Sequence, residues 1–119
     1  MPVSAKDFLE FAKWIHKPDL YEKEIGYRCS ISRAYYAAFH VAKQHLQMDE
    51  DAKHEEVIER LKDFDNGYGD DELSGRLLNL KKKRNNADYR LSYNINRDMA
   101  EKSLNKSKKF IEDVVKLKI

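Results

Sequence analysis

The sequence predicts an all-α protein: an up-and-down bundle of four to five helices, forming one domain over residues 1–119. Charged residues make up 37% of the chain, and there are only four glycines and two prolines, a composition that favours helices over turns. Apolar residues recur at helical spacing in several segments, and none shows the sustained alternation of a strand. A chain of 119 residues can bury one core without metals or disulfides.

The amino-terminal half contains two expected helices. Ser4 and Asp7 resemble a capping box, and apolar residues then repeat at helical spacing until Pro18 ends the first helix. A second helix is expected from about Tyr21 to Gln47, where only Gly26 interrupts. Because it carries two apolar stripes, this helix should be central and contact several neighbours. The stripes are Ile25, Cys29, Ser32, Tyr36, Phe39 and Ile31, Tyr35, Ala38, Ala42, His45.

The carboxy-terminal half contains the other helices. A short third helix is expected around Val57 to Phe64, before a turn-rich loop. The fourth should begin near Asp70 or Asp71, whose charges suit a helix N-terminus. Asn94 or Asn96 would cap the last helix, which closes the bundle.

The expected fourth helix has an arginine on its apolar stripe. Leu73, Leu77, Leu80, Arg84 and Ala87 fall on one face at a period of 3.6 residues. A guanidinium is never deprotonated in proteins, so burying it requires a carboxylate, a phosphate or water. Arg84 therefore indicates a wet cleft or a subunit interface, unless it lies at the edge of the stripe and reaches solvent. Periodicity alone leaves both interpretations open.

Positive charge is concentrated after this stripe. Segment 81–97 holds six basic residues and one acid, whereas the charged residues of segment 49–72 are mostly Asp and Glu. The net charge is only +2, so any binding of nucleic acid would depend on how the charge is distributed. Lysines near a helix C-terminus favour the macrodipole and solubility, but they can equally form a rim that attracts phosphate around Arg84. The candidates for such a rim are Lys81, Lys82, Lys83, Arg90 and, from the second helix, Arg33, which could instead pair across the bundle.

The single cysteine, Cys29, has no disulfide partner and no metal-ligand spacing, which predicts a reduced, buried thiol in a cytoplasmic protein. His40 and His45 are five residues apart and do not share the spacing of zinc ligands on a helix. The N-terminus lacks a hydrophobic signal core, and no segment has the roughly 18 to 20 apolar residues needed to cross a membrane. We therefore expect neither a metal, a cofactor nor a membrane.

Two segments resemble a known family. Arg84-Asn85, followed by Asn86-Ala87-Asp88-Tyr89, is similar to the signature of the HEPN superfamily, in which an arginine, a polar residue, a short spacer and a histidine lie near the end of a bundle helix. Ser32–His40 resembles the long second helix of small prokaryotic HEPN proteins. Tyr89 stands where the ribonucleases of that family carry histidine.

The resemblance implies a dimer in which two such motifs face each other across one cleft. It also implies metal-independent cleavage of RNA, in which Arg84 binds the phosphate beside Asn85 and the motif histidine helps the ribose 2′-hydroxyl to attack. Tyrosine, with a pKa of about 10, is a poor general base unless a nearby cation depresses that pKa. Asp88 is a substitute base, or a partner that neutralises Arg84.

Three functions remain open at this point. The first is a dimeric endoribonuclease, such as the toxin of a toxin–antitoxin or antiphage system. The second is a binding module for a separate nucleotidyltransferase, in which Tyr89 or Tyr93 receives a nucleotide. The third is a structural subunit in which Arg84 and Asp88 form an interface salt bridge. The first two imply RNA or a nucleotide as ligand; His54, before the third helix, has no assigned role.

Overall fold

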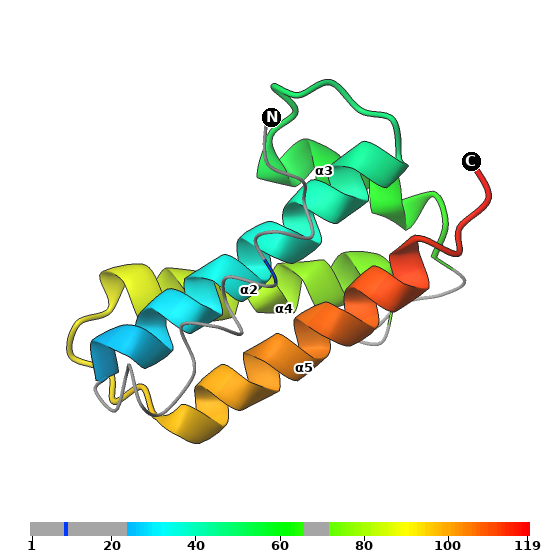
Figure 1. Cartoon of the computed structure of the whole chain (residues 1–119). Coiled ribbons are helices and arrows are strands. Elements are labelled where there is room, and N and C mark those ends of the chain that lie inside the picture. Colours follow the sequence, from blue (N-terminus) through cyan, green and yellow to red (C-terminus); the bar gives the residue numbers. More distant parts are fainter. Residues whose placement is uncertain (1–8, 10–23, 66–71) are drawn as a thin grey trace, which may run out of the picture.

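A computed structural model describes residues 9, 24–65 and 72–119. Within these residues it contains four helices and no strand (Figure 1): α2 (Glu24–His45), α3 (His54–Lys62), α4 (Leu73–Tyr89) and α5 (Arg97–Val114). The prediction of an all-α bundle is confirmed. The expected first helix, apart from Leu9, and most of the loop before α4 lie outside the described residues.

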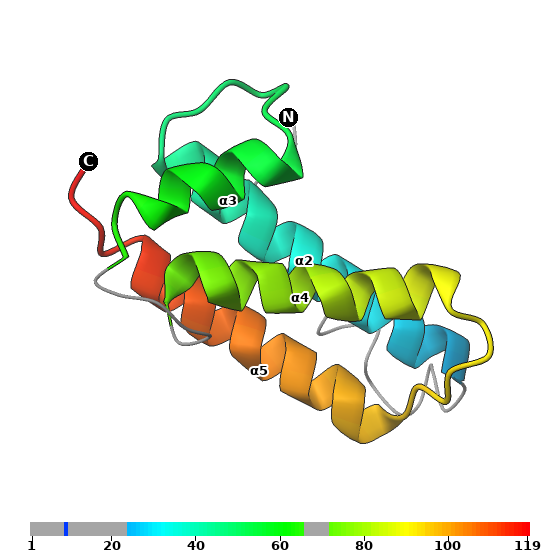
Figure 2. The same cartoon turned by 180° about the vertical axis from the view of Figure 1, so that it is seen from behind.

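Helices α2 and α5 run in the same direction and α4 runs in the opposite one (Figures 1 and 2). The shorter α3 lies beside the carboxy-terminal part of α2 and the first half of α4. As expected, α2 is central and contacts each of the other three helices. No helix in the described part of the chain is long and apolar enough to cross a membrane.

Small residues allow α2 and α5 to approach closely. Ala34, Ala37, Ala38 and Ala42 on α2 are completely buried. The hydroxyl of Ser107 on α5, also fully buried, donates a hydrogen bond of 2.7 Å to the carbonyl oxygen of Ala34. A hydrogen bond this short between a side chain of one helix and the backbone of another requires the two helices to be in close contact.

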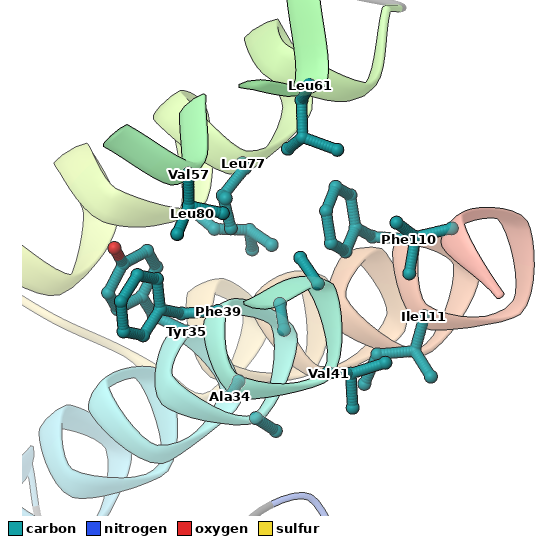
Figure 3. Packing of buried hydrophobic residues seen from close by; sticks show 14 of the residues in the cluster. Ala34, Tyr35, Phe39, Val41, Val57, Leu61, Leu77, Leu80, Phe110 and Ile111 are labelled. Carbon is teal, nitrogen blue, oxygen red and sulfur yellow. The ribbon is translucent and has the colours of Figure 1, made fainter. Parts of the chain in front are cut away.

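The main hydrophobic core lies where α3 meets α2, α4 and α5 (Figure 3). Val57 and Leu61 of α3 are fully buried there, together with Leu77 of α4 and Phe110 of α5. Tyr35 of α2 is also fully buried in this cluster. The packing of α3 fixes its first residue, His54, close to Tyr35.

The observed helix ends agree in part with the expected ones. Asn96 is the N-cap of α5, because its side chain accepts a hydrogen bond of 3.0 Å from the backbone N–H of Met99. Helix α4 begins at Leu73 with Glu72 as N-cap, later than the expected start at Asp70 or Asp71. The hydroxyl of Ser74 in the first turn of α4 hydrogen-bonds to the carboxylate of Asp65.

One expected stripe of α2 is wrong at its start. Ile25 is 62% exposed, and the thiol of Cys29 is exposed rather than buried. The buried face is instead formed by Gly26, Arg28 and Ser30. This end of α2 lies against backbone carbonyls at the end of α4, a polar surface to which an arginine is better suited than an apolar side chain.

Candidate functional site

Arg84 points into the bundle. Only 7% of the surface of Arg84 is exposed, and this residue continues the buried face of α4 between Leu80 and Ala87. The alternative, in which this side chain lies at the edge of the stripe and reaches solvent, is therefore wrong. An inward guanidinium has to be stabilised by groups within the protein or by a ligand.

The guanidinium of Arg84 has an incomplete set of polar partners. Its Nη1 lies 3.6 Å from Oδ2 of Asp88, too far for a normal hydrogen bond. Its Nε is buried and has no hydrogen-bond partner among the described residues. The same Asp88 oxygen also accepts a hydrogen bond of 3.3 Å from the hydroxyl of Ser32. The pair is thus looser than the bidentate arginine–carboxylate pairs found in proteins.

Three tyrosine rings surround this cation. The central carbon of the guanidinium lies 5.4 Å from the ring centroids of both Tyr35 and Tyr36, and 5.9 Å from that of Tyr89. Such cation–π contacts stabilise the charge but satisfy none of its N–H donors. Tyr35 is completely buried, whereas Tyr89 is 71% exposed. The cluster therefore extends from the core to the surface.

His54, which the sequence did not single out, joins the same cluster. Its Nδ1 lies 2.5 Å from the hydroxyl oxygen of Tyr35, and its ring packs 4.5 Å from that of Phe39. Burial, with the positive charges of Arg84 and Lys81, lowers the pKa of His54 below its ordinary value of 6.5. His54 is therefore neutral at neutral pH. No spacing in the sequence links it to Arg84, because the two residues come together only when α3 packs against α2 and α4.

The residues of the predicted basic rim differ in burial and in their partners. Lys81 pairs with Glu55 of α3 at 3.3 Å, and Lys82 is exposed. Lys83 instead lines a cavity between α4 and α5. Arg33 and Arg90, which are also candidates, are exposed. The candidate Asn85 is half-buried.

A sequence model of the HEPN domain matches residues 4–118. The chain belongs to the HEPN domain family. No curated protein sequence matches it. The resemblance seen in Arg84–Tyr89 and Ser32–His40 is thereby confirmed at the level of the family, and the all-α bundle is the fold expected of a HEPN domain.

A second buried arginine, not considered from the sequence, holds the end of α4 in this HEPN domain. The Arg28 guanidinium donates hydrogen bonds to the carbonyl oxygens of Ala87 at 2.9 Å and Tyr93 at 2.6 Å. Its other acceptors are the carbonyl oxygens of Asn86, Arg90 and Leu91 and the carboxylate of Glu24. Arg28 thus fixes the backbone on both sides of Asp88 and Tyr89.

The described residues offer few metal ligands near this cluster. Within residues 24–65 and 72–119, no group of three or more histidine, cysteine, aspartate or glutamate side chains is placed to hold a metal ion. The chemistry that the arrangement itself offers is a buried cation beside a neutral imidazole and an exposed tyrosine.

Proposed function

We propose that this HEPN-domain protein binds RNA at Arg84 and cleaves it without a metal, as a dimer whose two Arg84 sites face one cleft. The observation that supports this most is the buried Arg84 guanidinium: within the part of the chain that the structure describes, its Nε has no hydrogen-bond partner and its ion pair with Asp88 is 3.6 Å long. The oxygens of a phosphodiester group can accept two parallel hydrogen bonds from the planar guanidinium of an arginine. An arginine that served only in a structural salt bridge would have fewer unsatisfied N–H donors than Arg84 has.

In this proposal Arg84 stabilises the negative charge that develops on the phosphate oxygens during cleavage. The 2′-hydroxyl loses its proton and attacks the phosphorus, the bond from phosphorus to the 5′-oxygen breaks, and that oxygen takes up a proton and leaves as a 5′-hydroxyl, with a 2′,3′-cyclic phosphate on the other product. Tyr89 is exposed and lies beside the guanidinium, so a nucleobase can stack on its ring next to the bound phosphate.

In this proposal His54 is the general base, the role of the motif histidine in place of which this chain has Tyr89. When the Nδ1 proton of the neutral ring is donated to the hydroxyl oxygen of Tyr35, Nε2 carries the lone pair that accepts the proton of the 2′-hydroxyl. The buried surroundings of Tyr35 raise its pKa, so its hydroxyl stays neutral and continues to orient His54. Tyr89 is not required as a base.

The test is an assay of purified protein with single-stranded RNA in the presence of a chelator. We expect products that end in a 2′,3′-cyclic phosphate, and a loss of about 100-fold or more in rate for Arg84→Met and for His54→Asn. Since the pKa of His54 is below 6.5, the rate should be level above that pH and fall as the solution becomes more acidic.

A matched control is His45→Asn, which removes an imidazole outside the cluster. His45 Nε2 lies 2.8 Å from the carbonyl oxygen of Leu117, so this substitution should leave the rate of cleavage within about twofold of wild type. Intact RNA after incubation with the wild-type protein, or equal rates for wild type and Arg84→Met, would contradict the proposal.

The biological setting we propose is a toxin–antitoxin or antiphage system in the cytoplasm. A ribonuclease of this kind arrests growth when it is expressed alone. Expression of the wild-type chain should therefore slow growth, while expression of Arg84→Met to the same level should not. Equal growth of the two strains would argue against this setting without affecting the measured chemistry.

One observation favours a second function, in which the chain is the partner of a separate nucleotidyltransferase. The hydroxyl-bearing rings of Tyr89 and Tyr93 are both exposed, and that of Tyr89 lies beside the Arg84 guanidinium, so either hydroxyl is accessible to receive a nucleotide. Mass spectrometry of protein purified together with its neighbouring gene product would detect the added nucleotide. Under this alternative Tyr89→Phe or Tyr93→Phe loses the added mass, and the protein alone does not cleave RNA.

A further inference from the structure

A second face of α4 carries a basic cavity that is separate from the Arg84 cluster. The cavity has a volume of about 250 Å³ and lies between α4, α5 and the buried side of α2. Ile31, Ile95 and Met99 give it an apolar lining, and Lys83, Lys102 and Lys106 give it a basic one. Figure 2 shows α4 and α5 side by side along this face.

The charges at this cavity are poorly neutralised. Lys102 forms an exposed ion pair of 3.0 Å with Asp98, a type that contributes little to stability. Among the described residues, Lys83 and Lys106 form no ion pair. Two unpaired ammonium groups beside an apolar lining favour a ligand that combines negative charge with an apolar surface.

The size and chemistry of the cavity fit one nucleotide of an RNA strand. Pockets for larger ligands start at roughly 300 Å³, so this cavity has room for little more than a single ring system. A nucleobase can pack on the isoleucines and on the sulfur of Met99, which interacts favourably with aromatic rings. The Asn86 side chain, which also lines the cavity, has both a donor and an acceptor for a base edge.

The cavity and the Arg84 cluster are both bounded by α4, but they lie on different sides of this helix. Successive residues of an α-helix are rotated by about 100°, so Lys83 and Asn86 lie about 100° and about 160° around the helix axis from Arg84, away from Asp88. A strand whose phosphate is held at Arg84 would reach the cavity by passing around α4. We infer that this cavity binds a nucleotide flanking the scissile phosphate of single-stranded RNA, an inference that rests on the proposed function.

The test is binding of a fluorescently labelled single-stranded RNA at several salt concentrations. The double variant Lys83→Gln/Lys106→Gln should weaken binding at least tenfold. It should also reduce the slope of log affinity against log salt by about 1.4, since each lysine–phosphate contact on a single strand contributes about 0.7. The matched control is Lys108→Gln/Lys116→Gln, which removes two exposed lysines of the carboxy-terminal region that do not line the cavity.

Equal effects of the two double variants would overturn the inference, because only overall charge would then matter. A second variant, Met99→Glu, places a carboxylate in the apolar lining and should weaken binding with the lysines intact. If wild type binds RNA through these lysines but cleaves none, the cavity stands and the proposed function fails. If Arg84→Met abolishes cleavage while the cavity variants bind RNA normally, the proposed function stands and the inference about the cavity fails. Absence of RNA binding by wild type would overturn both.

Discussion

At the scale of single residues, the state of Arg84 separates a binding role from a structural one. A buried ion pair in good geometry is costly to break, typically by about 3–5 kcal/mol, when one partner is removed. Arg84 is not in such a pair: its contact with Asp88 is 3.6 Å long, and Asp88 keeps its hydrogen bond from Ser32. Within the protein, the desolvation cost of this guanidinium is therefore offset by cation–π contacts and a long ion pair rather than by close hydrogen bonds.

We expect Arg84→Met to leave the free energy of unfolding unchanged or to raise it by about 1 kcal/mol, since an apolar side chain of similar length needs no polar partners. Urea denaturation followed by circular dichroism measures this change. A decrease of about 3 kcal/mol would instead favour the structural salt bridge, and the loss of cleavage in the same variant would then reflect damage to the fold.

At the scale of helices, Arg28 links the start of α2 to the end of α4. Its guanidinium donates to the carbonyl oxygen of Ala87 in the last turn, where helix carbonyls lack an intrahelical donor, and its charge complements the negative end of the α4 dipole. The carbonyls that Arg28 contacts flank Asp88 and Tyr89. The position of the exposed Tyr89 therefore depends on Arg28, which lies 59 positions before Ala87 in the sequence.

Arg28→Lys should therefore destabilise the protein by about 2–3 kcal/mol, because an ammonium cannot reach the several carbonyls that the planar guanidinium contacts. Hydrogen exchange should become faster at the backbone amides around Tyr89 to Tyr93. The control is Arg97→Lys, whose partner Glu101 lies 3.1 Å away in a half-exposed pair; it should change stability by less than about 0.5 kcal/mol. Equal effects of both substitutions would show that Arg28 is not an anchor.

The four described helices could be predicted from the sequence to within a few residues because their signals are local. The apolar stripe of α4 and the cap at Asn96 involve residues within a few turns of one another. His54 and Arg28 could not be predicted as part of the site, because their partners are brought together only by the packing of α2 against α3 and α4. The same limit explains Cys29: periodicity locates an apolar stripe but does not tell which neighbouring surface is polar.

At the scale of the whole molecule, three large apolar or aromatic side chains are exposed where α4 ends, in a protein in which 37% of residues are charged. Leu91 is 81% exposed, and the rings of Tyr89 at the end of α4 and Tyr93 in the following loop are also exposed. Exposed apolar patches of this kind often mark interfaces between proteins. A second copy of the chain would cover this loop and bring a second Arg84 site close, as the proposed function requires.

We expect the wild-type protein to be dimeric in light scattering after size exclusion and Leu91→Glu to shift it to the monomer, because a carboxylate would be buried without a partner at the interface. The control is Ile119→Glu, which places the same charge on an exposed residue at the end of the chain and should leave the dimer intact. Cleavage of RNA should fall together with the dimer.

The outcome also decides which residues make up one site. Arg84, His54 and Tyr35 come from a single chain, so a monomer could in principle hold the phosphate and the base. If Leu91→Glu is monomeric and still cleaves RNA at the wild-type rate, each chain contains a complete site and the shared cleft is wrong. If cleavage is lost while RNA binding at low salt persists, the second protomer contributes to the reaction itself, and the exposed Tyr89 is the group best placed to reach across.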